Sequence, residues 1–171
     1  MDAHERAHNG HPTAPHDEGA DDSTEPRRRP VVVHVEDDDD LRMLCAEILD
    51  DAGFEVVGCP TLRAGRLAIG ASVPDVLLVD RDLPDGSGLD LVRWLRSNPS
   101  YATVHVIVFS ARRSREDVEA AIAAGCDAFL GKPCAPDMLV ETVEDIARPD
   151  PDAGLRRTGR RRKYAPVAGP R

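Results

Sequence analysis

The chain has no apolar run long enough to span a membrane. A transmembrane helix needs about 18 or more consecutive apolar residues, and polar or charged side chains interrupt every apolar stretch of the 171 residues well before that length. Residues 1–6 are polar and lack the apolar centre of a secretory signal peptide. These absences argue against an integral membrane protein and a secreted protein, so we expect a cytoplasmic protein with no membrane partner.

Cysteine and lysine are both rare. The four cysteines form no CxxC pair, which argues against a structural metal site and favours reduced thiols packed in a core; they are Cys45, Cys59, Cys126 and Cys134. Only two of the 22 basic residues are lysines. Lys132 is the single lysine between residues 30 and 148, so we expect it to perform a task for which the guanidinium of arginine is unsuited.

Basic residues of any kind are few in the central part of the chain. Between residues 30 and 148, 22 acidic residues outnumber 11 basic ones, whereas residues 149–171 carry seven basic and two acidic residues. Surfaces that bind nucleic acid are positively charged. The sequence therefore argues against binding to nucleic acid, except for weak binding through the basic tail.

Large apolar side chains are almost absent from both ends of the chain. Residues 1–29 are rich in His, Asp, Glu, Pro and Gly and bury too little surface to offset their ordering entropy, so this N-terminal segment is predicted to be disordered. Residues 149–171 show no apolar periodicity and are predicted to form a basic, disordered tail. A single folded domain is predicted over residues 30–148.

Within that domain, apolar runs alternate with amphipathic segments. The runs predict strands over residues 31–35, 54–58, 76–79, 104–109 and 128–130. Helices are predicted after each strand, and they are expected to end at Gly53, at Gly70, before Asn98, at Gly125 and before Pro149. Strands that alternate with helices form a parallel sheet covered on both faces, so the predicted fold class is α/β, doubly wound. The short, mixed second strand is expected at an edge of the sheet.

Polar side chains follow four of these strands. Glu36 and Asp37 follow the first strand, Asp80 the third, Ser110 the fourth and Lys132 the fifth. Side chains at the carboxyl ends of parallel strands point into one crevice. Carboxylates without nearby His or Cys ligands favour Mg²⁺, and Asp80 could then attack phosphorus and form an acyl phosphate. The Lys132 ammonium would neutralise phosphoryl oxygens, and the Ser110 hydroxyl could donate to one of them.

Four stretches of the chain resemble the receiver domains of two-component response regulators. They are residues 33–38, 78–88, 108–111 and 131–133. Each stretch lies at the end of a predicted strand, and together they extend the resemblance over about residues 30–148. The resemblance implies a flavodoxin-like (βα)5 fold with a five-stranded parallel sheet in the order 2-1-3-4-5.

The resemblance also implies a Mg²⁺ site. Asp37 and Asp80 would bind the ion through their carboxylates, and Asp82 through its backbone carbonyl. Glu36 would act through a bound water. By the same resemblance, Asp80 is the residue that accepts a phosphoryl group.

Four further residues receive roles by the resemblance. Lys132 matches the phosphate-binding lysine, and Pro133 matches a position with a cis peptide bond. Ser110 matches the switch hydroxyl, and Phe129 matches the aromatic residue that moves inward when that hydroxyl moves. Asp82 and Arg112 stand two residues after Asp80 and Ser110, where the family tunes dephosphorylation, so we expect both to affect its rate, in a direction that the sequence does not give.

The function implied is signalling through phosphorylation. A histidine kinase or a histidine phosphotransfer protein would donate the phosphoryl group, and the signal would pass to an unknown effector protein, since no effector domain follows residue 148. Such a domain promotes only its own phosphorylation and dephosphorylation, so we expect no enzyme acting on a separate substrate.

Other interpretations of the same residues stay open. Asp80 and Asp82 also resemble the Asp-x-Asp motif of haloacid-dehalogenase-type phosphatases, although that motif normally lies on the first strand of a longer chain. A receiver used mainly to bind nucleic acid through residues 149–171, or one regulated without phosphorylation, would be further alternatives. Residues 37–40 could simply cap the first helix.

Overall fold

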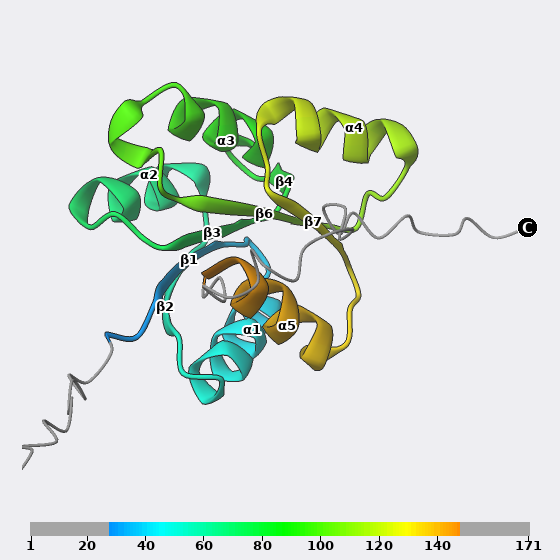
Figure 1. The fold of residues 1–171 in the computed structure, drawn as a ribbon. Coiled ribbons are helices and arrows are strands. Elements are labelled where there is room, and N and C mark those ends of the chain that lie inside the picture. Colours follow the sequence, from blue (N-terminus) through cyan, green and yellow to red (C-terminus); the bar gives the residue numbers. More distant parts are fainter. Residues whose placement is uncertain (1–27, 148–171) are drawn as a thin grey trace, which may run out of the picture.

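The computed structural model describes residues 28–147, and five of its strands form one parallel sheet. The strands lie in the order β2-β1-β3-β6-β7 (Figure 1). Their bounds are Val31–Val35 for β1, Glu55–Cys59 for β2, Val76–Val79 for β3, His105–Ser110 for β6 and Ala128–Gly131 for β7. Because β6 and β7 are the fourth and fifth strands of this sheet along the chain, the predicted order 2-1-3-4-5 is confirmed, with the second strand at an edge.

Five α-helices cover the sheet on both faces. Their bounds are Asp39–Asp51 for α1, Leu62–Ala71 for α2, Gly88–Arg96 for α3, Arg115–Ala124 for α4 and Pro136–Ala147 for α5. Helices α1 and α5 lie on one face, and α2, α3 and α4 lie on the other (Figure 1). This arrangement confirms the doubly wound α/β fold class. None of the helices in residues 28–147 is long and apolar enough to cross a bilayer.

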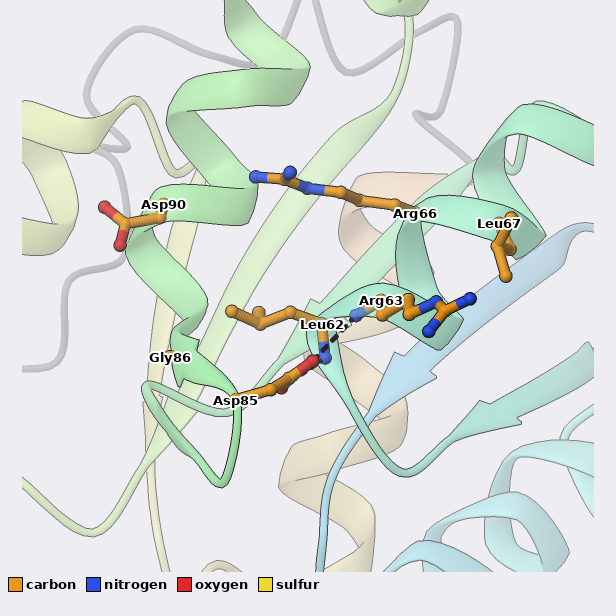
Figure 2. Close-up of a pocket in the computed structure, with 7 residues that line it drawn as sticks. All are labelled: Leu62, Arg63, Arg66, Leu67, Asp85, Gly86 and Asp90. Carbon is orange, nitrogen blue, oxygen red and sulfur yellow. Dashed lines mark hydrogen bonds between the residues drawn. The ribbon is translucent and has the colours of Figure 1, made fainter.

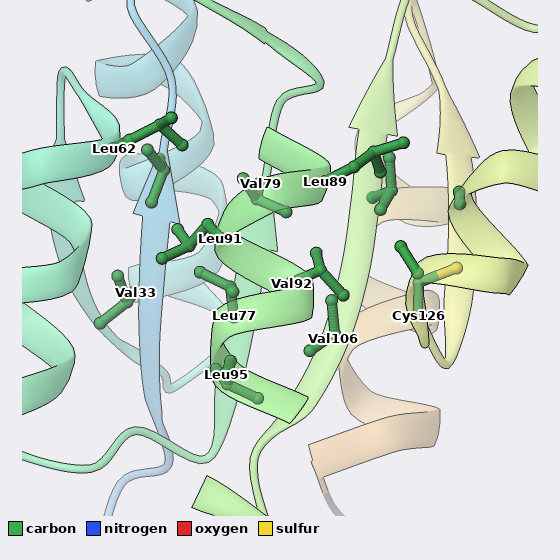
Figure 3. Packing of buried hydrophobic residues seen from close by; sticks show 14 of the residues in the cluster. Val33, Leu62, Leu77, Val79, Leu89, Leu91, Val92, Leu95, Val106 and Cys126 are labelled. Carbon is green, nitrogen blue, oxygen red and sulfur yellow. The ribbon is translucent and has the colours of Figure 1, made fainter. Parts of the chain in front are cut away.

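Alternate residues of the central strands supply two separate cores. On β1 and β3, Val33 and Leu77 pack toward α2, α3 and α4, where they meet Leu91 and Val92 of α3 (Figure 3). The preceding residue along β1, Val32, packs instead with α1 and α5. All four residues of β3 are fully buried, as expected for a strand covered on both faces.

Capping explains where several helices begin and end. Asp38 is the N-cap of α1, since its carboxylate accepts a hydrogen bond from the backbone N–H of Leu41 at 2.9 Å, so one of the acidic residues after β1 does have the capping role. Ser114 and Asp117 form a capping box at the start of α4. Gly125 ends α4 with φ of 102°, a left-handed conformation that glycine adopts without strain.

Some local predictions were wrong by a residue. Strands β2 and β6 each begin and end one residue later than predicted, and Ser110 is paired within β6, opposite Gly131 of β7. Helix α2 continues through Gly70 to Ala71, because Gly70 lies on an exposed helical turn where no packing forces an end.

Three short elements were not predicted at all. Strands β4 (Asp82–Leu83) and β5 (Gly86–Ser87) pair as a two-residue antiparallel hairpin between β3 and α3, and a 3-10 helix spans Pro99–Tyr101. Strands of two residues carry no periodicity in the sequence, so no pattern signals them. The hairpin matters for the site, because it contains Asp82.

Two residues of the predicted N-terminal disordered segment contact the domain. Arg28 forms an ion pair with Asp75 at 2.9 Å, and Arg29 forms one with Asp50 at 2.6 Å. The rest of that segment, residues 1–27, lies outside the described residues, as does the basic tail from residue 148 onwards. Their predicted disorder therefore stays a prediction.

Candidate functional site

Strand register brings the predicted site residues to one edge of the sheet. Val35 of β1 pairs with Val79 of β3, so the next residues, Glu36 and Asp80, lie side by side. Val79 in turn pairs with Val108 of β6, which places Ser110 near the same edge. Gly131, which pairs with Ser110, directly precedes Lys132. Four polar residues from four strands thus meet where the sequence predicted a crevice.

Asp80 lies at the centre of this edge and is 9% exposed. Its Oδ2 accepts a hydrogen bond from the Lys132 Nζ at 2.7 Å. Its Oδ1 accepts one from the backbone N–H of Arg81 at 2.5 Å, and the N–H of Asp82 lies 3.4 Å from the same oxygen. The carboxylate is therefore held in one orientation by the turn that follows β3 and by the lysine opposite.

Lys132 bridges two carboxylates. Its Nζ lies 2.5 Å from Glu36 Oε2 and 2.7 Å from Asp80 Oδ2, and also 5.1 Å from the centre of the Phe109 ring. Burial lowers the pKa of the ammonium, but the hydrogen bonds to Asp80 and Glu36 and their negative charges raise it by more, so the pKa lies above its ordinary value. Lys132 therefore places a positive charge at this edge of the sheet, in contact with both carboxylates.

Glu36, Asp37 and Asp80 form an acidic cluster. One carboxylate oxygen from each lies within 4.8 Å of the other two. Glu36 is almost fully buried, and this burial raises the pKa of its carboxyl, whereas the Asp37 side chain is exposed. Like charges this close repel unless a cation lies between them, and oxygen-only ligands suit Mg²⁺. The residues present therefore fit the predicted magnesium ion.

The two predicted switch residues lie on neighbouring strands. Ser110 is fully buried, and its Oγ accepts a hydrogen bond from the backbone N–H of Arg112 at 3.2 Å. Phe129 is 6% exposed and packs in the core beneath α3 and α4. Val108, two residues before Ser110, pairs with Phe129 in the sheet. Because alternate residues of a strand share a face, Ser110 and Phe129 lie on the same side of the sheet.

Two ion pairs surround the site and were not predicted. Arg81, the residue after Asp80, pairs with Asp117 of α4, and both side chains are largely buried. Asp82 pairs with Arg112, whose Nε lies 2.8 Å from its Oδ2. The sequence marked Asp82 and Arg112 by their positions but gave no sign that they touch.

Gly88 and His34 were also missed as residues that shape the site. A side chain at Gly88 would meet the backbone oxygen of Asp80, since a Cβ there would lie 1.8 Å from it. His34 is fully buried in β1, two residues before Glu36. A histidine inside an otherwise all-valine strand was the available signal for the second of these residues.

Two further observations concern the surroundings of the site. The peptide bond between Lys132 and Pro133 is cis, as the resemblance implied.

A surface pocket lies elsewhere, between α2 and the β4–β5 hairpin, where the N–H groups of Leu62 and Arg63 donate to the Asp85 carboxylate (Figure 2). None of the seven residues lining it belongs to the edge described above, so the hollow and the acidic cluster are separate features.

Comparison with known proteins gives transcriptional regulatory proteins and response regulators among the relatives. KDP operon transcriptional regulatory protein KdpE of Escherichia coli (strain K12) is 38% identical over 102 residues, which cover 60% of this chain and 44% of that protein. Polar-differentiation response regulator DivK of Brucella ovis is 28% identical over 116 residues, which cover 66% of this chain and 92% of that protein. The chain spans about half the length of the transcriptional regulators it matches.

Solved structures share the fold. A putative response regulator from Chloroflexus aurantiacus superposes with a TM-score of 0.67 at 28% identity and covers 70% of this chain and 98% of its own. The chemotaxis protein CheY4 of Vibrio cholerae, at 24% identity and a TM-score of 0.66, shows the same fold over 69% of this chain and 98% of its own.

The fold and the site residues define a class, the flavodoxin-like α/β receiver domain. The family model of the response regulator receiver domain matches residues 32–144. This match covers well over half of the chain, and the chain belongs to that family.

Proposed function

We propose that this chain is a phosphorylated signalling domain in which Asp80 accepts a phosphoryl group from a histidine kinase or a histidine phosphotransfer protein. The observation that carries the proposal is the position of Asp80 between the Lys132 ammonium, 2.7 Å away, and the acidic cluster with Glu36 and Asp37. A carboxylate with a fixed positive charge on one side and a cation site on the other is suited to attack phosphorus.

In the transfer step, an Asp80 carboxylate oxygen forms a bond to phosphorus while the bond from phosphorus to the donor's imidazole nitrogen breaks. The electron pair of the broken bond stays on that nitrogen, and Asp80 becomes an acyl phosphate. A bound Mg²⁺ would neutralise charge on the phosphoryl oxygens. Lys132 would exchange its hydrogen bond to Asp80 for one to a phosphoryl oxygen, and the Ser110 hydroxyl would turn to donate to another.

The ion would be held by the carboxylates of Asp37 and Asp80 and the backbone carbonyl of Asp82, with Glu36 acting through a water. The acidic cluster supports the three carboxylates of this set, because one oxygen of each already lies within 4.8 Å of the others.

Loss of the signal would be a hydrolysis. A water oxygen forms a bond to phosphorus, the bond from phosphorus to the Asp80 oxygen breaks, and inorganic phosphate leaves with the carboxylate restored. The chain would then promote only its own phosphorylation and dephosphorylation, without turning over a separate substrate. We propose a cytoplasmic location and output through an effector protein that recognises the phosphorylated state, with Ser110 and Phe129 as the switch.

The test is to incubate the full chain with acetyl phosphate and Mg²⁺ and to measure its intact mass. We expect a gain of one phosphoryl group that hydroxylamine removes, as it does from acyl phosphates. The Asp80→Asn variant should show no gain, whereas Asp90→Asn, at an exposed position on α3, should be labelled like the unchanged chain. Equal labelling of Asp80→Asn would refute the proposal.

A phosphatase of the haloacid-dehalogenase type would also pass through an aspartyl phosphate. It would, however, release phosphate repeatedly from a phosphomonoester. Asp80 follows the third strand in sequence, not the first, which is why we propose the signalling role. Sustained turnover of a generic phosphomonoester by the full chain would favour the phosphatase instead.

A further inference from the structure

His34 is a buried polar residue without a hydrogen-bond partner. Its side chain is fully buried, and neither Nδ1 nor Nε2 makes a hydrogen bond with any of residues 28–147. It occupies a position in β1 between Val33 and Val35. Burying an unpaired polar group destabilises a fold, so packing alone does not account for an imidazole where the rest of the strand is valine.

The ring lies next to Glu36. The Nε2 atom is 3.9 Å from Glu36 Oε2, which is too far for a hydrogen bond but close enough for a small shift to make one. The same oxygen accepts its present hydrogen bond from Lys132, at 2.5 Å. The other oxygen, Oε1, lies 3.4 Å from the backbone N–H of Asp38. Two donors, Lys132 and His34, therefore face one buried carboxylate oxygen.

The surroundings of His34 favour the neutral form of its imidazole. Burial lowers the pKa of His34 to about 3, and the nearby positive charges of Lys132 and Arg42 act in the same direction. A neutral imidazole carries one N–H donor, and the Nε2–H tautomer directs that donor toward Glu36.

We propose that His34 is a positioning residue, which donates a hydrogen bond from Nε2 to Glu36 Oε2 when Lys132 turns toward a phosphoryl group on Asp80. This inference rests on the function proposed above. As Lys132 follows a phosphoryl oxygen, its bond to Glu36 lengthens, and Glu36 is almost fully buried. Without a replacement donor, a buried carboxylate oxygen would lose its partner and the side chain would be free to follow the lysine. His34 keeps Glu36 in place beside Asp37 and Asp80.

Nuclear magnetic resonance of the full chain, with ¹⁵N-labelled histidine, tests the proposal directly. Beryllofluoride with Mg²⁺ serves as a non-covalent mimic of the phosphoryl group. The chain has six histidines, and the signal of His34 is the one lost in a His34→Val variant. We expect a neutral Nε2–H tautomer whose proton moves downfield and exchanges more slowly when beryllofluoride is added.

Spectra of a second, uniformly ¹⁵N-labelled sample separate the two proposals. If backbone amides near Asp80 do not respond to beryllofluoride and Mg²⁺, the proposed function fails. If those amides shift while the His34 Nε2–H signal does not, only the role of His34 is overturned.

Rates of phosphorylation by acetyl phosphate provide a second readout. We expect His34→Val to be phosphorylated about tenfold more slowly, which is the factor expected for one hydrogen bond to a charged group. His34→Gln, which keeps an N–H donor, should regain most of the rate. His105→Val is a matched control at a half-exposed position at the start of β6 and should have the rate of the unchanged chain. A His34→Val rate equal to that of the unchanged chain would overturn the proposal, as would equal losses in the Val and Gln variants, since these would indicate packing alone.

Discussion

Arg112 and Asp82 form an ion pair that joins the loop after β6 to the β4–β5 hairpin. The Arg112 Nε lies 2.8 Å from Asp82 Oδ2, and the two side chains are 60% and 57% exposed. Asp82 stands two residues after Asp80, at the start of β4, and Arg112 stands two residues after Ser110, in the loop after β6. The pair thus bridges neighbouring strands beside the carboxylate that is proposed to carry the phosphoryl group.

We expect Asp82→Ala and Arg112→Ala each to hasten loss of the phosphoryl group, because without the ion pair water reaches the phosphorus more easily. An exposed ion pair contributes up to about 1 kcal/mol, so the decay should be up to about fivefold faster. The measurement is the decay of phosphorylated protein after the donor is removed.

A double-mutant cycle provides the control for this prediction. The double variant should decay no faster than either single variant, because both changes break the same contact. Added salt, which screens exposed charges, should hasten decay of the unchanged chain but not of the variants. Additive effects of the two substitutions would show that each residue acts independently of the pair.

Glu36 should give the stability of the metal-free protein a characteristic pH dependence. Burial raises the pKa of Glu36 in the folded state. Folding therefore favours the protonated carboxyl, and this contribution to the free energy of unfolding is fully present below the ordinary pKa of glutamate. The contribution is lost as pH rises through the folded-state pKa. Relative to the unchanged chain, Glu36→Gln should therefore become progressively more stable as pH rises from about 4 through the raised folded-state pKa of Glu36. Thermal unfolding in a chelator measures this difference.

Asp85→Asn supplies a control of opposite sign. Hydrogen bonds from the backbone N–H groups of Arg63 and Leu62 hold the pKa of Asp85 below its usual range. The contribution of these hydrogen bonds to the free energy of unfolding is present at neutral pH and is lost as pH falls. Asp85→Asn should therefore become less stable, relative to the unchanged chain, as pH rises. A stability difference between Glu36→Gln and the unchanged chain that does not vary with pH would contradict the assigned pKa shift.

Magnesium should stabilise the folded chain through Asp37. A ligand that binds only the folded state at a concentration 100 times its Kd stabilises it by about 2.7 kcal/mol. We expect Mg²⁺ to raise the Tm of the unchanged chain and to have little effect on Asp37→Asn. The neighbouring Asp38→Asn variant is the matched control, since Asp38 caps α1 and asparagine caps helices as well as aspartate does. If Mg²⁺ raised the Tm of Asp37→Asn as much as that of the Asp38→Asn control, the ion would not bind through Asp37.

The convergence of Asp80, Glu36 and Lys132 could be predicted because it depends on strand order alone. Each residue directly follows a strand of a parallel sheet, and the carboxyl ends of such strands meet at one edge. Apolar runs reveal those strands even from a single sequence. The predicted positions of strand ends were right to within one residue, which was enough to identify the edge.

The contacts around that edge could not be predicted in the same way. Arg81 pairs with Asp117 36 positions later, and nothing local distinguishes either residue from the many other charged side chains of the chain. Such a pair depends on where the start of α4 lies relative to the loop after β3, which is a property of the whole fold. His34 did break a local pattern, but its lack of a partner becomes evident only when the positions of Glu36 and Lys132 are known.

Gly88 should tolerate no side chain, because α3 begins directly against the backbone of Asp80. The N–H of Gly88 donates to the Arg81 carbonyl at 2.7 Å, and a Cβ at this position would lie 1.8 Å from the Asp80 oxygen and 2.9 Å from a methyl group of Val79. Only a shift of the backbone at Asp80 or of α3 would relieve that contact. Overpacking of this kind costs about 1–3 kcal/mol or more, so Gly88→Ala should lower both the free energy of unfolding and the rate of phosphorylation.

Gly70→Ala is the matched control for that substitution. Gly70 lies within α2, and no heavy atom lies within 4 Å of the position its Cβ would take. Alanine is a better helix former than glycine, so this variant should be more stable than the unchanged chain by about 0.5–1 kcal/mol. Denaturant unfolding of the two variants measures both effects. Both variants replace glycine by alanine. A loss of stability in Gly88→Ala together with a gain in Gly70→Ala would therefore trace the loss to the close approach of α3 and Asp80. A Gly88→Ala variant as stable as the unchanged chain would mean that α3 and Asp80 are not in contact.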